Sequence, residues 1–229
     1  MGVRKIKANY RSVTGTHGPS GQDFESSLEQ LMMVLLEFDP YVERFDAQPL
    51  QIEYKEDGKL RSYVPDLLIH FKKNSPYHPR RSRPLLCEIK YRSDYVQNFA
   101  EIRPKVRQGL RYAKLNQYRF DVITDIKIKN TYLQNVLFLR RYHNKVPQAH
   151  LHQPLISKLK ALKKTTPNIL IRALSGDLTL QAEYLFELWI MVCKFEVLTD
   201  LNVPLNQDSV IFHNNGGRDL CQLISSPVL

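Results

Sequence analysis

The stretch from Tyr63 to Lys90 constrains the fold of this chain more than any other part of its 229 residues. It is predicted to run as strand, basic loop and strand, with Asp66 on the first strand and Glu88 and Lys90 at the end of the second. Side chains alternate in direction along a strand, so Glu88 and Lys90 point the same way. Two carboxylates and a lysine are therefore expected at one edge of a sheet.

This arrangement suits hydrolysis of a phosphodiester. Carboxylate oxygens hold Mg²⁺ or Mn²⁺ while the ion keeps waters and takes substrate phosphate oxygens as further ligands, and the ion lowers the pKa of a bound water. Lys90 would orient or deprotonate that water. Pro65-Asp66 followed by Glu88-Ile89-Lys90 is the PD-(D/E)xK pattern of restriction-endonuclease-like nucleases. The alternative is a structural ion pair at a strand end.

Positive charge is concentrated in the part of the chain that carries this pattern. The net charge is +10, and residues after Pro147 contain as many acidic as basic side chains, so the whole excess precedes them. Such a field suits a polyanion such as DNA. We expect backbone contacts from the loop at 72–84 and from a helix at 101–115, through Lys72, Lys73, Arg80, Arg81, Arg83, Arg103, Lys105, Arg107 and Arg111.

Other classes of protein are disfavoured. The three cysteines are far apart in the sequence and form no C-x-x-C pair, which argues against a disulfide framework and a zinc site. No apolar run approaches the roughly 20 residues of a membrane span, and the N-terminus lacks the apolar core of a signal peptide. We expect a cytoplasmic protein without a membrane segment.

The order of predicted elements indicates an α/β fold, a restriction-endonuclease-like mixed sheet flanked by helices. Apolar periodicity predicts a first helix that begins at an Asp23 N-cap and ends at Asp39-Pro40. The elements that follow are a hairpin over 50–63, strands over 64–71 and 85–90, a helix over 101–115, a strand over 118–124 and a helix over 131–142. Glu25 and Glu29 lie one turn apart on the first helix. Either could reach the metal, or both could be solvated.

The chain is predicted to contain three parts: a basic N-terminal arm over 1–22, the catalytic domain over 23–147, and a small domain with a tail over 148–229. The boundary is placed in the polar stretch Asn144–Gln153. Short helices followed by strands at 195–200 and 208–213 suggest a winged-helix-like C-terminal domain.

Several segments, taken in order, resemble the TnsA family, the endonuclease subunits of heteromeric cut-and-paste transposases. They are Asn9–Gly15, Phe24–Gln30, Leu35–Pro40, Gln48-Pro49, Pro65-Asp66 and Glu88–Lys90. The resemblance covers the first two thirds closely and the last third in outline. It implies that Glu29, rather than Glu25, is the helix carboxylate, that Asp66 and Glu88 bind the metal, and that Lys90 is the catalytic lysine. Gln30 departs from the arginine common in the family.

The resemblance further implies a Mg²⁺-dependent endonuclease, with Mn²⁺ as a substitute, that cuts the 5′ ends of a transposon in the bacterial cytoplasm. A DDE transposase of the TnsB type would cut and join the 3′ ends of the transposon-end DNA, and an ATPase regulator of the TnsC type would contact the C-terminal region. Two alternatives stay open: a standalone restriction or repair nuclease of the same fold, and a non-catalytic DNA-binding assembly subunit.

Overall fold

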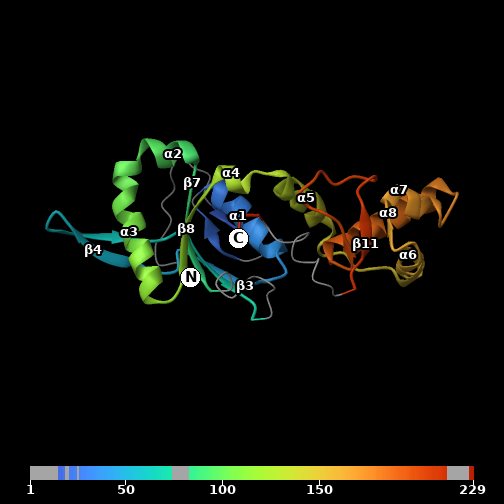
Figure 1. Ribbon diagram of the computed structural model, residues 1–229, viewed down its shortest axis with the longest axis horizontal. Coiled ribbons are helices and arrows are strands. Elements are labelled where there is room, and N and C mark those ends of the chain that lie inside the picture. The colour runs from blue at the N-terminus through green and yellow to red at the C-terminus, as the bar shows by residue number, and fades with distance from the viewer. Residues whose placement is uncertain (1–14, 19–20, 25, 74–82, 216–226) are drawn as a thin grey trace. The chain divides into compact units, whose positions relative to one another are not determined.

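The computed structural model describes residues 15–18, 21–24, 26–73, 83–215 and 227–229 (Figure 1). They belong to two compact units, Met1–Lys129 with Val228–Leu229, and Asn130–Pro227. Most of the predicted arm lies outside the described residues, as do Arg80, Arg81 and the segment 216–226 of the tail. In the part of the chain that is described, no helix is long and apolar enough to cross a membrane.

A four-stranded mixed sheet forms the centre of the first unit. Its strands, in spatial order, are β3 (Val42–Ala47), β6 (Leu67–Phe71), β7 (Leu85–Lys90) and β8 (Arg119–Thr124). The first three pair antiparallel, and β7 pairs with β8 in parallel. Helices flank this sheet, which confirms the predicted α/β, restriction-endonuclease-like class. Strand β3 was not predicted because its sequence, Val-Glu-Arg-Phe-Asp-Ala, does not alternate cleanly between apolar and polar residues.

Helix α1 (Ser27–Phe38) lies on one side of the sheet and α3 (Phe99–Leu115) on the other, so that β7 and β8 run between them (Figure 1). The apolar positions Leu28, Met32 and Leu35 are buried, and each such side chain contributes about 2 kcal/mol. The helix ends before Asp39, as predicted. Its N-cap is Ser26, so the predicted Asp23 cap is wrong.

Two short strands explain that correction. Asp23 lies in β2 (Asp23–Phe24), which pairs with β1 (Gly15–Thr16), and its backbone is therefore used in a strand rather than at a helix start. Asp and Ser are both good N-caps, and local sequence does not choose between them.

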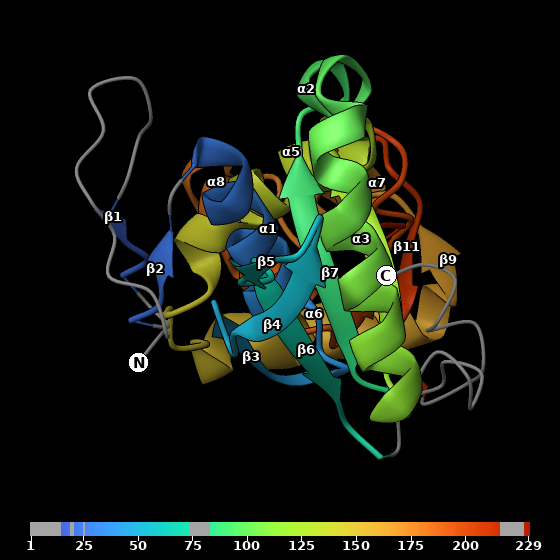
Figure 2. The same ribbon diagram turned by 90° about the vertical axis from the view of Figure 1, so that its left-hand side faces the viewer.

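Helices α2 (Arg92–Gln97) and α3 (Phe99–Leu115) connect β7 to β8, where the sequence predicted one helix over 101–115. Helix α3 runs alongside β7 in Figure 2. Its close approach to β8 depends on Gly109, because a Cβ atom there would lie 2.3 Å from the Phe120 ring. Helix α4 (Asp125–Ile128) follows β8.

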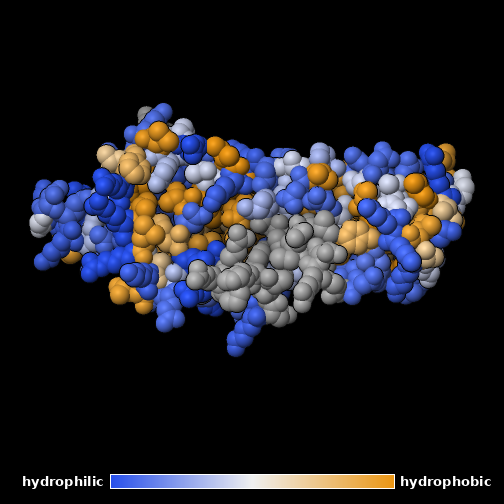
Figure 3. Space-filling view, in the orientation of Figure 1, coloured by the Kyte–Doolittle hydropathy of each residue, from blue (hydrophilic) through white to orange (hydrophobic). Residues whose placement is uncertain are grey.

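The predicted hairpin is present as β4 (Ile52–Glu56) and β5 (Lys59–Tyr63), but it forms a two-stranded sheet of its own. The hairpin extends away from the rest of the first unit (Figure 1), and its surface is almost entirely hydrophilic (Figure 3). Its base is held by a cluster of Ile52, Tyr54 and Tyr63 that packs against Leu50 and Tyr112. Because Tyr112 lies on α3, the hairpin and α3 share one small core.

The second unit contains helices and a small antiparallel sheet of strand order β10-β11-β9. Its elements are α5 (Thr131–Leu139), η1 (Arg140–Tyr142), α6 (Ala149–Leu162), β9 (Lys164–Thr165), α7 (Pro167–Arg172), α8 (Leu178–Cys193), β10 (Val197–Leu198) and β11 (Ile211–His213). The winged-helix-like assignment of this unit stays a prediction.

The two compact units divide between Lys129 and Asn130. Helix α5 and η1 pack against α8 within the second unit. The ring centroids of Phe138 and Trp189 lie 5.5 Å apart, and those of Tyr142 and Phe186 lie 5.2 Å apart. These aromatic contacts lie within the second compact unit, and the predicted division of the chain into arm, catalytic domain and C-terminal domain stays a prediction.

Candidate active site

Asp66, Glu88 and Lys90 come together at one edge of the large sheet. The register pairs Leu67 of β6 with Cys87 of β7, so the next position along each strand places Asp66 opposite Glu88. The Lys90 ammonium lies 2.8 Å from Glu88 Oε1 and 3.3 Å from Asp66 Oδ2. The structure thus brings together the three residues that strand alternation predicted.

Backbone pairing holds Asp66 in place although it precedes the first residue of β6. Its amide donates to the carbonyl of Cys87 at 3.2 Å, which continues the ladder by one residue. Its side-chain Oδ2 accepts a hydrogen bond from the Ile89 amide at 2.6 Å. Burial first, and then the charges of Glu88 and Glu29, raise the pKa of Asp66 to about 8 against the opposing effects of Lys90 and the Ile89 amide.

The Lys90 side chain is about one third exposed. Burial alone lowers the pKa of this ammonium, but the carboxylates of Asp66 and Glu88 outweigh burial and raise it above its ordinary value. Lys90 also donates to the Ile89 carbonyl at 3.1 Å. In this arrangement Lys90 is a fixed cation between two carboxylates.

Glu29 lines the same pocket from the first turn of α1. Ser26 positions it, because the Glu29 amide donates to Ser26 Oγ at 3.2 Å and that hydroxyl donates to Glu29 Oε1 at 2.9 Å. This reciprocal pair is a variant of the capping box. Glu25 lies outside the described residues, so the structure does not compare the two glutamates.

The pocket has a volume of about 210 Å³ and includes residues that the sequence did not place there. Tyr63 is 4% exposed, and its hydroxyl donates to Glu88 Oε2 at 2.6 Å. Burial and the adjacent Glu88 raise the pKa of Tyr63. Lys105 lines the pocket from α3, whereas the sequence indicated only a general DNA contact. No local sequence pattern predicts that Tyr63 and Lys105 line this pocket, because both positions depend on how the hairpin and α3 pack.

The donor set fits a hard divalent cation. Two carboxylate oxygens already lie around one ammonium, and the pKa of Asp66 is raised first by burial and then by the neighbouring Glu88 charge. Oxygen ligands of this kind suit Mg²⁺. Among the residues that the structure describes, no three His, Cys, Asp or Glu side chains are arranged to hold one ion. Glu29 as a third metal ligand therefore stays a prediction.

The basic residues predicted to contact DNA differ in their surroundings. Lys72, Lys73 and Arg83 are exposed at the two described ends of the basic loop, and Lys72 Nζ donates to the Pro40 carbonyl at 2.7 Å. On α3 all the predicted residues are exposed: Arg103, Lys105, Arg107 and Arg111. Lys105 is the member of this group that lines the pocket of Asp66 and Glu88.

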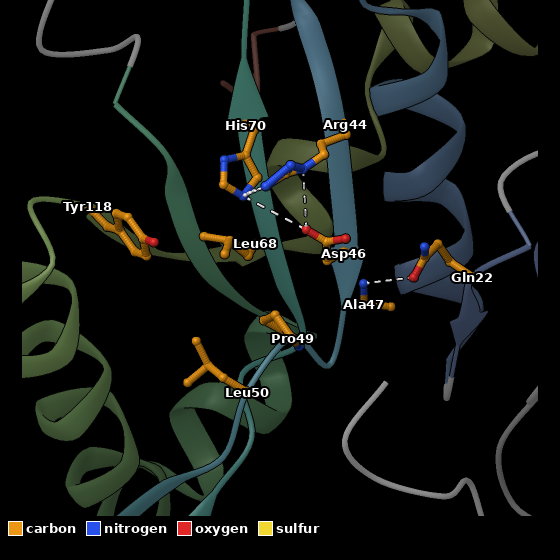
Figure 4. A pocket seen from close by; sticks show the side chains of 9 residues that line it. All are labelled: Gln22, Arg44, Asp46, Ala47, Pro49, Leu50, Leu68, His70 and Tyr118. Carbon is orange, nitrogen blue, oxygen red and sulfur yellow. Dashed lines mark hydrogen bonds and ion pairs between the residues drawn. The ribbon is translucent and has the colours of Figure 1, made fainter. Parts of the chain in front are cut away.

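A second pocket of about 250 Å³ lies beside β3 and β6 (Figure 4). Arg44 donates toward His70 Nε2 at 3.1 Å, and Arg44 Nε lies 3.9 Å from Asp46. Burial and the Arg44 charge lower the pKa of His70. This pocket has one carboxylate and no lysine, so it lacks the constellation found around Glu88.

A mixed sheet flanked by helices, with Asp66, Glu88 and Lys90 at its edge, defines the restriction-endonuclease-like class. Residues 39–125 match the family model described as TnsA-like endonuclease N terminal. This part of the chain is therefore similar to TnsA-like endonucleases, and the similarity supports a nuclease of the transposase family. The matched region includes Asp66, Glu88 and Lys90 and begins after Glu29. A comparison with curated proteins gave no match.

Proposed function

We propose that this protein is a Mg²⁺-dependent DNA endonuclease that cuts the 5′ ends of a transposon, the strand that is not transferred, together with a DDE transposase. The observation that carries the proposal is the pocket in which Lys90 Nζ lies within 3.3 Å of both Asp66 and Glu88, inside the segment that matches TnsA-like endonucleases.

Each side chain has a distinct task. Asp66 and Glu88 would hold the divalent ion, and Glu29 would add negative charge or a further ligand. The ion would lower the pKa of a water and neutralise charge on the scissile phosphate, and Mn²⁺ could replace Mg²⁺. Lys90 offers N–H donors that orient the attacking water. Lys105 faces the same pocket and supplies a positive charge for a substrate phosphate.

The positive charges of α3 and of the basic loop favour grip on the DNA backbone rather than recognition of bases. Sequence choice then has to come mainly from a partner, and a TnsB-type transposase that binds the transposon ends fits this need. The part of the chain after Pro147 contains as many acidic as basic side chains, which favours a protein partner such as a TnsC-type ATPase. The isolated protein is expected to bind DNA weakly, with strong salt dependence, and to cut little.

Strand-specific cleavage of transposon-end DNA tests the proposal. The reaction contains Mg²⁺ with the protein alone, with its cognate transposase, and with the transposase and Lys90→Ala. Lys127→Ala is the matched control, because Lys127 pairs with Asp121 at 2.7 Å and does not line the pocket. We expect 5′-strand cuts only with both proteins, a loss of at least about 100-fold in Lys90→Ala, and 3′ cuts that persist.

Two results would contradict the proposal. Robust site-specific cutting by the protein alone would favour a standalone restriction or repair nuclease of the same fold. Unchanged 5′ cuts with Lys90→Ala would mean that another site is responsible and that the acidic cluster is structural, as expected for a non-catalytic assembly subunit.

A further inference from the structure

The hydroxyl of Tyr63 and the ammonium of Lys90 hold the two oxygens of Glu88 separately. Tyr63 donates to Oε2 at 2.6 Å, and Lys90 lies 2.8 Å from Oε1. The Glu88 side chain is 7% exposed, so bulk water has little access to replace either contact. A carboxylate held at both oxygens keeps one orientation, and orientation of a ligand sets how well it binds a metal.

We propose that Tyr63 is a positioning residue that fixes the Glu88 carboxylate for metal binding, and that the β4–β5 hairpin acts as the support that delivers it. This proposal rests on the proposed function, since it assigns Glu88 to the metal. Tyr63 would not touch the substrate or the ion. Its effect would pass through Glu88 Oε2.

The packing of the hairpin explains why Tyr63 reaches Glu88. Tyr63 is the last residue of β5, directly paired with Ile52 of β4, and both belong to the cluster that packs against Tyr112 of α3. The ring of Tyr63 therefore anchors the hairpin while its hydroxyl faces the pocket. Tyr54 lies in the same cluster and is similarly buried, at 9% exposed, but does not line the pocket.

This difference between the two tyrosines provides a matched pair of variants. Tyr63→Phe and Tyr54→Phe each remove one hydroxyl from the same cluster and keep the ring. Mn²⁺ binding to the full chain is measured by electron paramagnetic resonance for both variants, for the wild type and for Glu88→Gln. Thermal unfolding followed by circular dichroism sets a temperature at which every variant is folded. We expect Tyr63→Phe to weaken Mn²⁺ binding by about 10- to 100-fold and Tyr54→Phe to leave it unchanged.

A second readout separates positioning from a merely structural role. In cleavage with the cognate transposase, Tyr63→Phe should require more Mg²⁺ for its half-maximal rate, and saturating Mg²⁺ should restore most of the rate. Loss of fold would not be rescued in this way.

The outcomes distinguish a failure of the positioning role of Tyr63 from a failure of the proposed metal site. If the wild type binds Mn²⁺, Glu88→Gln does not, and Tyr63→Phe binds as tightly as the wild type, the positioning role is refuted and the metal site stands. If Glu88→Gln binds Mn²⁺ as well as the wild type does, the proposed function itself loses its metal site. Equal weakening in Tyr63→Phe and Tyr54→Phe would also refute the proposal, because the effect would then belong to the cluster and not to the contact with Glu88.

Discussion

Replacing Asp66 by asparagine is predicted to stabilise the metal-free protein while it removes a metal ligand. The Asp66 carboxyl has a pKa raised to about 8, first by burial and then by Glu88. A carboxyl with a raised pKa binds its proton more tightly in the folded state than in the unfolded state. Its contribution to the free energy of unfolding therefore falls as pH rises from the unfolded pKa toward the folded one.

The magnitude follows from the size of that shift. A rise from 3.8 to about 8, at ~1.4 kcal/mol per pKa unit, corresponds to a destabilisation of roughly 4 kcal/mol near neutral pH. This figure already includes the attraction to Lys90, which is 3.3 Å from Asp66 Oδ2, and the cost of burying the asparagine amide offsets part of the gain. The asparagine amide oxygen can still accept the hydrogen bond from the Ile89 amide. The expected net gain is about 1–3 kcal/mol near neutral pH and roughly a third of that near pH 5.

Urea unfolding in the presence of EDTA measures this gain at both pH values. Asp46→Asn is the control, because Asp46 is 45% exposed and its replacement should change stability little. Added Mg²⁺ should stabilise the wild type and not Asp66→Asn, because only the folded wild type keeps the carboxylate pair. The reasoning is refuted if Asp66→Asn is less stable than the wild type near neutral pH, or if its gain does not grow with pH.

Three further predictions concern stability. Gly109→Ala should lower the free energy of unfolding by about 1–3 kcal/mol, because the alanine Cβ would overlap the Phe120 ring. This cost outweighs the higher helix propensity of alanine. Urea unfolding measures it, and a variant more stable than the wild type would contradict the close packing of α3 on β8. Ser26→Ala should cost about 1 kcal/mol through loss of the N-cap of α1, and unchanged stability relative to the exposed control Ser93→Ala would count against that cap. Glu187→Ala should destabilise the second unit by roughly 3 kcal/mol, because Glu187 is fully buried and contacts His152 and the Gln148 amide. Thermal unfolding measures the loss. A change no larger than that of the exposed control Glu183→Ala would contradict the prediction.

Much of the first unit could be predicted because its determinants are local. Strand alternation placed Glu88 and Lys90 on one face. Asp66 becomes their neighbour because β6 pairs antiparallel with β7 in a register that sets Asp66 opposite Glu88. The same kind of pattern gave the end of α1 and the β4–β5 hairpin. These features need no knowledge of distant contacts.

What could not be predicted depends on tertiary packing. Asp23 has the chemistry of an N-cap, and only its pairing with β1 shows that Ser26 takes that place. Strand β3 lacks a clear alternation and becomes evident only beside β6. The contact of Tyr63 with Glu88 spans residues that are 25 positions apart, so no sequence window contains its cause. The aromatic contact of Phe138 on α5 with Trp189 on α8 likewise joins residues 51 positions apart.

The proposed endonuclease activity depends most directly on a divalent cation between Asp66 and Glu88. Crystals of the protein soaked in Mn²⁺ and measured for anomalous scattering would locate that ion. The account predicts an anomalous peak at carboxylate distance from both residues, and no such peak in crystals of Glu88→Gln. A wild-type pocket without a peak, with Lys90 still bridging the two carboxylates at saturating Mn²⁺, would contradict it and would identify the cluster as a structural ion pair.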